Sequence, residues 1–347
     1  MKETTNKRNS NIELLRILSM IMIILHHSYI HSDIKSHLSN TNYIIFAILS
    51  LIGQLAINIF ILITGYYMVN KKTNKKSIAK LIFETIFYSY FILILYLNFS
   101  PHKQNSTILK LCTPITSDSH WFITAYILLY ISIPFINKLI ENLNKKQFTQ
   151  LNIFFIICFS ILPSIFILLH YFSIYTWFIV LYSIGAYLRL YKDNIKFKDS
   201  NIILIISIIA LISTVIVQMK YKTSYINLNY TSNFLSLLIS IGIFMLFINL
   251  KDFKSGIINS IASSTLGIYL LHDNFLVRDF IWKRLHIEDF IVEKHFWIRE
   301  ILLVLTIFLV GLVIDKLRQI FIEKPIFKLW DSIEKKNKNK IKHIDNS

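Results

Sequence analysis

The feature that most constrains this chain is a series of apolar stretches long enough to cross a lipid bilayer. A helix needs about 20 mostly apolar residues to span ~30 Å of hydrocarbon, because each residue adds about 1.5 Å. Ten segments qualify, near residues 12–30, 43–69, 78–98, 120–139, 150–170, 174–190, 201–219, 233–250, 258–277 and 297–319. The sequence therefore predicts an all-α fold, a polytopic transmembrane helical bundle of about ten spans.

The overall composition excludes a soluble enzyme. The chain has 347 residues, of which 54% are hydrophobic and 16% charged, whereas soluble globular proteins have about 25% charged residues. The net charge of +17 would suit a nucleic-acid partner. We expect none, because the basic residues lie in short stretches between apolar runs rather than on one soluble face. The two cysteines, Cys112 and Cys158, have no metal-ligand spacing, so we expect neither a disulfide framework nor a metal site.

The two ends of the chain differ in character. The first apolar run, Ile12 to Tyr29, contains charged residues and no small-residue cleavage site, so we expect a retained span rather than a signal peptide. Residues 1–331 form one predicted membrane-embedded domain without internal repeats. Residues 332–347 are polar and rich in lysine, and we expect a disordered cytoplasmic tail there.

The loop charges predict how the spans are oriented. Cytoplasmic loops of membrane proteins carry an excess of Lys and Arg. If the amino terminus is cytoplasmic, the inside segments hold 26 of the 37 basic residues and the outside segments hold ten, with Arg16 inside a span. This bias supports an even number of spans with both termini in the cytoplasm. We expect the membrane to be the plasma membrane.

The first span carries ionisable residues that are costly in a membrane and are therefore candidates for function. Arg16 and His27 are eleven residues apart, which places them within about 20° of one helix face and about 16 Å apart along the axis. Glu13 lies three residues before Arg16 and is close enough to pair with it. His26 points about 100° away from His27, and we interpret it as structural.

Each of these residues also has a purely structural interpretation. Arg16 could anchor the span by extending toward the interface beside Glu13. His27 could be packed near the outer interface without any chemical role. The shared face of Arg16 and His27 is what favours a functional pair.

Other spans contain polar residues of less certain meaning. Gln54, Asn58 and Gly65 form a polar and small stripe on the second span, which is typical of helix packing in lipid. Glu84 on the third span fits either structural pairing or function. His120, beside Trp121, and His272 lie at the outer ends of their predicted spans. An interfacial aromatic belt explains Trp121 alone, and His272 could equally be an exposed interface residue.

Several stretches in order along the chain resemble the acyltransferase 3 family of membrane acyltransferases. The family signature is Arg or Lys, ten residues and then His, and Arg16 and His27 match it. The other similar stretches are INIFILITGYY (57–67), HWFITAYILLYISIPFI (120–136), STLGIYLLH (264–272) and EKP (323–325). The resemblance covers nearly the whole chain, from Asn9 to Trp330.

The resemblance implies a bundle of about ten spans that moves an acyl group, usually acetyl from acetyl-CoA, onto hydroxyls of cell-surface or exported glycans. The partners it implies are an acyl-CoA donor, a glycan acceptor and the lipid bilayer, with no permanently bound cofactor. The site residues it implies are His27 and His120 for catalysis, Arg16, Lys71 and Lys72 for the donor, and Trp121, Tyr269 and His272 for the substrate. Relatives that modify O-antigen carry an Arg-x-Arg pair after the second span, where this chain has Asn70-Lys71-Lys72.

The chemistry of the residues leaves two routes open. Histidine titrates nearest neutral pH, so His27 could take the hydroxyl proton as a general base or carry the acyl group transiently. A transporter or flippase of a glycan precursor is the alternative class. However, seven glycines and five prolines in 347 residues offer few hinges. A non-catalytic scaffold would leave the alignment of Arg16 with His27 unexplained.

Overall fold

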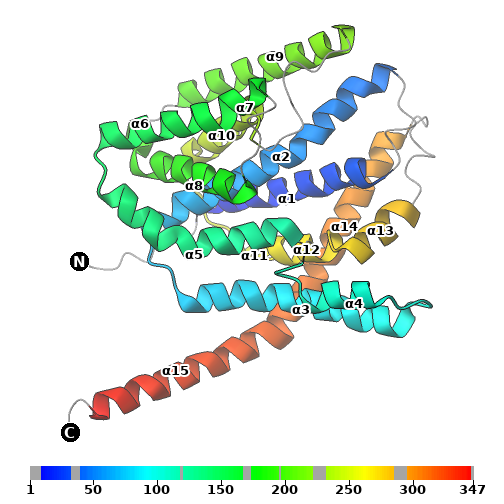
Figure 1. Cartoon of the computed structure of the whole chain (residues 1–347), viewed down its shortest axis with the longest axis vertical. Helices are drawn as coiled ribbons and strands as arrows, with labels where there is room; N and C mark the ends of the chain where they lie inside the picture. The colour runs from blue at the N-terminus through cyan, green and yellow to red at the C-terminus, as the bar shows by residue number, and fades with distance from the viewer. Residues whose placement is uncertain are drawn as a thin grey trace.

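The computed structural model of the chain is an all-α bundle. It describes residues 9–32, 40–117, 120–166, 173–194, 197–221, 232–284 and 295–344. Within these ranges every regular element is helical, and most of the long helices run side by side (Figure 1). The predicted fold class is therefore confirmed.

Nine of the ten predicted spans coincide with a continuous helical run. They are α1 (Ser10–His31), α2 (Asn40–Met68), α3 (Lys75–Phe99), α5 (Trp121–Glu141), α6 (Lys145–Ile156) with η3 (Ile157–Ile161) and α7 (Leu162–Ile165), α8 (Ile174–Leu190), α9 (Phe197–Tyr221), α10 (Phe234–Asn249) and α14 (Phe296–Arg318). Seven helical runs among the described residues are long and apolar enough to cross a membrane. The helices α8 and α10 are apolar but shorter, with 17 and 16 residues.

The ninth predicted span, 258–277, is not a single helix. It is divided into α11 (Gly256–Ala262) and α12 (Thr265–His272), and α13 (Phe275–Arg284) follows. The break falls at Ser263 and Ser264, and Ser264 is the N-cap residue of α12. Serine side chains compete for backbone hydrogen bonds and so favour helix ends over helix interiors. The prediction of one continuous span here was wrong.

The expected disorder of the tail was also wrong over residues 332–344, and residues 345–347 lie outside the described residues. The helix α15 (Lys324–Ile344) follows α14 through a short π-helical turn, η7 (Gln319–Glu323). The sequence from Ser332 to Ile344 contains no Gly or Pro and is rich in lysine, a good helix former. An ion pair between Lys76 and Asp331 and a contact between the rings of Phe83 and Phe327 hold the start of α15 against α3.

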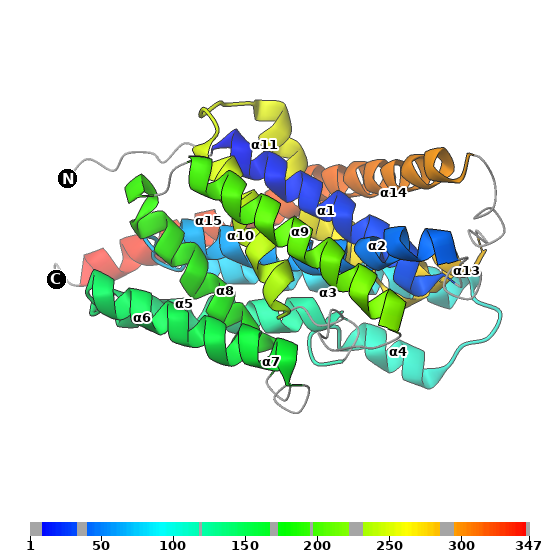
Figure 2. The same cartoon turned by 90° about the horizontal axis from the view of Figure 1, so that it is seen from above.

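Two apolar cores hold the bundle together. One joins α2, α5, α8 and α10 around buried residues such as Leu62, Leu181 and Phe244. The other joins α1, α3, α12 and α14 around residues such as Ile24 and Ile268. Figure 2 shows the bundle from above, with α9 and α14 on its outside. Side chains such as Ile206 and Val313, 61% and 59% exposed, suit contact with lipid rather than water.

The polar and small stripe of α2 serves helix packing. Asn58 is fully buried and accepts a hydrogen bond from the indole N–H of Trp177 on α8, at 3.0 Å. A Cβ atom at Gly65 would lie 2.2 Å from the backbone oxygen of Tyr182, and one at Gly185 would lie 2.3 Å from that of Leu62. The two glycines therefore let the backbones of α2 and α8 approach closely, as small residues do in membrane helices.

We expect Gly65→Ala to destabilise the protein, because the added methyl group must push α8 away. Overpacking of this kind costs about 1–3 kcal/mol. The measurement is the thermal unfolding midpoint of the purified protein in detergent. Gly256→Ala is the matched control, since nothing lies within 4 Å of the Cβ position there. Equal midpoints for the two variants would contradict the close packing of α2 on α8.

Candidate functional site

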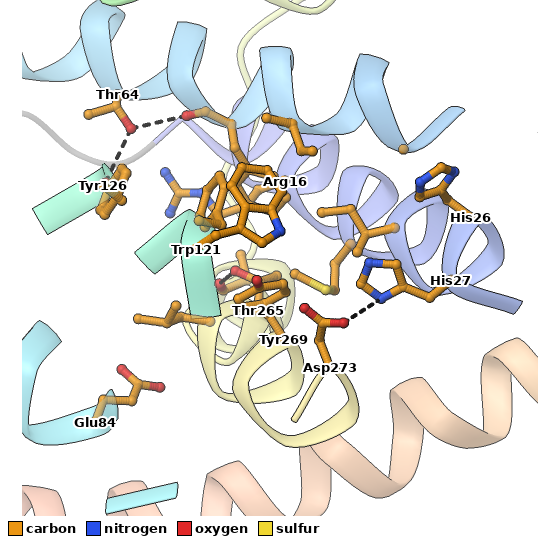
Figure 3. Close-up of a pocket in the computed structure, with 18 of the residues that line it drawn as sticks. Arg16, His26, His27, Thr64, Glu84, Trp121, Tyr126, Thr265, Tyr269 and Asp273 are labelled. Carbon is orange, nitrogen blue, oxygen red and sulfur yellow. Dashed lines mark hydrogen bonds and ion pairs between the residues drawn. The ribbon is translucent and has the colours of Figure 1, made fainter. Parts of the chain in front are cut away.

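A cavity of about 310 Å³ lies between α1, α2, α3, α5 and the broken pair α11–α12. Its walls are largely apolar and aromatic, and a few polar side chains interrupt them (Figure 3). Ala262, Ser263 and Thr265 at the break in the ninth predicted span line the cavity, so the break contributes directly to its shape. A concave, mostly apolar pocket with a few polar groups is typical of a ligand-binding site.

One face of α1 lines the cavity over three helical turns. Arg16, Met20, Ile23 and His27 follow one another at intervals of four, three and four residues, and all four line the cavity. Eleven residues of helix separate Arg16 and His27 by about 16 Å along the axis. The predicted shared face of these two residues therefore faces this cavity, with the cation toward the start of α1 and the imidazole toward its end (Figure 3).

Arg16 is held by the carboxylate predicted to pair with it. Its Nη1 lies 3.1 Å from Oε2 of Glu13, whose side chain is buried, and the arginine side chain remains 25% exposed. A guanidinium has five N–H donors, so this one contact leaves others available for a ligand. In Figure 3 the guanidinium lies on the side of Tyr126 and Glu84, away from His27.

His27 belongs to a buried cluster of polar side chains at the end of α1. Its Nδ1 lies 3.0 Å from Nε2 of His272 and 3.4 Å from Oδ1 of Asp273. The Nδ1 of His272 lies 2.7 Å from the carbonyl oxygen of Ile268, one turn earlier on α12. The same oxygen of Asp273 also faces Nη1 of Arg278, at 3.7 Å. The histidine of α1 is therefore in direct contact with the two residues that end α12.

The cluster has some of the geometry of a metal site. One ligand atom from each of His27, His31 and Asp273 can lie within 4.8 Å of the others. Nitrogen and carboxylate ligands of this kind suit zinc. The guanidinium of Arg278 faces the same carboxylate oxygen, however, and already supplies positive charge there. This arrangement favours an ion-pair cluster over a bound cation.

The other predicted substrate residues form a second wall. Trp121 and Tyr269 line the cavity. His120, predicted to be catalytic, is not among the described residues that line the cavity, and its ring lies 6.2 Å from that of Tyr269. It is 1% exposed, and neither ring nitrogen has a hydrogen-bond partner in the part of the chain that the structure describes. His120 therefore has unused hydrogen-bonding capacity beside the cavity.

The two lysines predicted to bind the donor lie outside the cavity. Lys71 and Lys72 are exposed residues just after α2, and Lys71 lies 5.4 Å from the centre of the Tyr67 ring. Neither is among the described residues that line the cavity. Of the three predicted donor-binding residues, the structure places Arg16 alone in the cavity wall.

His26 also lines the cavity, which its angular offset from His27 did not predict. Its ring packs against α2 at Gly53, where an added Cβ would lie 2.3 Å from the imidazole. The absence of a side chain at Gly53 thus makes room for this second histidine. Gly53 on the second predicted span was the sequence signal for this contact. However, spacing along the sequence does not show which residues of two helices face each other.

A network of buried charges lies beside the cavity, and sequence analysis missed most of it. Arg318 is 2% exposed and contacts three carboxylates, those of Glu84 (3.0 Å), Asp315 (2.8 Å) and Glu323 (2.7 Å). Glu84, for which pairing and function were both open, is therefore paired and also lines the cavity. The sequence signal for this network was the pair of charged residues Asp315 and Arg318 at the end of the tenth predicted span. An arginine that is buried there needs carboxylate partners.

We expect Arg318→Met to destabilise the protein strongly. Removing one partner from a buried ion cluster leaves unpaired charge and costs about 3–5 kcal/mol. The loss should appear as a lower thermal midpoint and a lower yield of monodisperse protein in detergent. Lys76→Gln is the control, because its partner Asp331 is exposed and such pairs contribute less than about 1 kcal/mol. A variant at Arg318 as stable as this control would contradict a structural role for the network.

Comparison with known proteins gives one match. A family model described as an acyltransferase domain matches residues 9–316. The matched range contains the cavity-lining faces of α1, α2, α3, α5 and α12. No curated protein and no solved structure matches the chain.

Proposed function

The chain belongs to this acyltransferase family, acyltransferase 3, and from that premise we propose that it transfers an acetyl group from acetyl-CoA to a hydroxyl of a glycan. It is a membrane-embedded acyltransferase. In the proposed reaction the donor binds from the cytoplasm, and the acceptor is a cell-surface polysaccharide or a lipid-linked glycan outside the plasma membrane.

The observation that carries the proposal is that Arg16 and His27 line the same cavity. The phosphates of coenzyme A are too polar to enter lipid, so they remain at the cytoplasmic face. A guanidinium binds phosphate oxygens through charge-assisted, often bidentate hydrogen bonds. The flexible arm of the donor can then extend about 16 Å along the apolar wall of α1 and bring the thioester to His27.

His27 acts on the acyl group by one of two routes. As a general base it accepts the hydroxyl proton while the oxygen attacks the thioester carbonyl, and the departing thiolate is then protonated. As a carrier it attacks the carbonyl itself, releases the thiol of coenzyme A, and passes the acyl group to the hydroxyl in a second step. Both routes need a ring nitrogen with a free lone pair. In the first route this lone pair faces the hydroxyl of the acceptor, and in the second it faces the thioester carbonyl of the donor.

The acceptor end of the cavity is proposed to lie at His120, Trp121 and Tyr269. His120 is buried beside this end of the cavity rather than in its lining, so its two unpartnered nitrogens can bind sugar hydroxyls only after the side chains of the wall move apart. Trp121 is 41% exposed and offers a flat apolar ring to a sugar face. The excess of Lys and Arg in the loops at the start of α1 supports the assignment of that end to the cytoplasm.

We expect His27→Ala to abolish acetylation while the protein still inserts and purifies normally. The measurement is the transfer of radiolabel from acetyl-CoA to glycan by purified protein that has been reconstituted into membranes. His102→Ala is the matched control, because His102 lies exposed in the connection after α3 and should leave transfer unchanged. Labelled product from the His27 variant at the normal rate would overturn the proposal. Glycan that crosses the membrane without gaining label would favour a transporter instead.

We expect Arg16→Lys to raise the KM for acetyl-CoA about tenfold, with a smaller change in kcat. Loss of one charge-assisted hydrogen bond is worth about 1.5 kcal/mol, close to one factor of ten in affinity. Initial rates against donor concentration, at saturating acceptor, test this. Arg189→Lys is the control, since Arg189 contacts Tyr66 rather than the cavity. A larger effect on the KM of the acceptor than of the donor would contradict the assignment of Arg16.

A further inference from the structure

We propose that His272 is a positioning residue that fixes His27 in the tautomer whose Nε2 is free to act on the acyl group. This inference rests on the proposed function, in which His27 performs the transfer. The sequence resemblance implied that His272 binds substrate. In the structure it is 2% exposed and is not among the described residues that line the cavity. Its Nε2 contacts Nδ1 of His27, and Nε2 of His27 is not part of that contact.

The carbonyl oxygen of Ile268 determines the directions of the hydrogen bonds that link it to His272 and His272 to His27. The carbonyl oxygen of Ile268 can only accept, so Nδ1 of His272 must carry the proton in their 2.7 Å contact. In a neutral imidazole the other nitrogen is then an acceptor. The 3.0 Å contact therefore has Nδ1–H of His27 donating to Nε2 of His272. This leaves the lone pair of the His27 ring on Nε2.

His272 is a better orienting partner for His27 than the neighbouring carboxylate. Oδ1 of Asp273 lies 3.4 Å from Nδ1 of His27, which is longer than a normal N–H···O hydrogen bond of 2.7–3.2 Å. That oxygen also faces Arg278 at 3.7 Å and His31 at 3.9 Å. Its charge is therefore shared among three groups, whereas Nε2 of His272 approaches Nδ1 of His27 directly.

Close packing of α12 on α14 holds the carbonyl group of Ile268 in place. A Cβ atom at Gly267 would lie 2.2 Å from Oδ1 of Asp315, and one at Gly311 would lie 3.2 Å from the side chain of Ile268. Ile268 itself is fully buried. Its carbonyl oxygen therefore has little freedom to move, and the ring of His272 takes its orientation from a rigid part of the backbone.

The test compares two replacements of His272 and reads out the tautomer as well as activity. His272→Gln keeps an amide oxygen that can accept from Nδ1–H of His27, whereas His272→Leu keeps no acceptor. We expect the Leu variant to lose about 10–100-fold in kcat, as metal sites do when a partner that orients a ligand histidine is removed, with the donor KM unchanged. The Gln variant should recover most of the loss. His102→Gln, on an exposed histidine, is the control.

The tautomer is measured by ¹⁵N NMR of ring-labelled histidine in the purified protein, with the His27 signals assigned by difference from His27→Ala. In the wild type, Nε2 of His27 should resonate as an unprotonated ring nitrogen. In His272→Leu it should shift toward the average of both tautomers. A protonated Nε2 in the neutral wild-type ring would overturn the inference, even if the Leu variant did not fold.

The two proposals fail in distinguishable ways. If the wild type transfers no acetyl group, the proposed function fails while the NMR measurement still reports the tautomer. If the wild type is active and the Leu and Gln variants have equal kcat values, His272 does not act as an acceptor for His27, and the inference fails while the proposed function stands.

Discussion

The buried guanidinium of Arg318 is the interaction on which the arrangement of the candidate site depends. It joins Glu84 of α3, Asp315 of α14 and Glu323 of η7 within 3.0 Å. A buried arginine without these partners would be strongly unfavourable, so the helices that carry them are held in one register. Asp315 also accepts a hydrogen bond from the hydroxyl of Tyr88 at 2.8 Å and packs against Gly267 of α12. The ion cluster thus sets the distance from α3 and α14 to the helix that carries His272.

The break between α11 and α12 depends on side chains of α14 and η7. A lipid environment supplies no hydrogen bonds to an interrupted helix, so the free backbone groups must find partners within the protein. The amide of Gln319 donates to the carbonyl oxygen of Ser263 and to the hydroxyl of Ser264, at 3.2 and 3.1 Å. Lys316 donates to the carbonyl oxygen of Ser260 at 2.6 Å. With its start held in this way, α12 ends at His272 and Asp273 beside His27.

Hydropathy predicted much of the fold. The two wrong predictions, a continuous ninth span and a disordered tail, have clear physical causes. The position of nearly every predicted span was right, because an apolar run of sufficient length has no good alternative to a helix in lipid. The break at Ser263 depended on partners about 55 residues away in the chain, which no local window contains. The lysine-rich residues after 331 looked disordered by charge, but α14 and η7 provide a helix that they continue, so no costly new nucleus is needed.

The sequence by itself determined that Arg16 and His27 share a face of the first helix, since that follows from helical geometry alone. It also contained Glu13 at the spacing that lets it pair with Arg16. Only the tertiary structure decided that this face lines a cavity, that Lys71 and Lys72 lie outside it, and that His27 touches His272. The physical reason is range: spacing along one helix sets angles within that helix, whereas contacts between helices depend on the packing of side chains from distant segments.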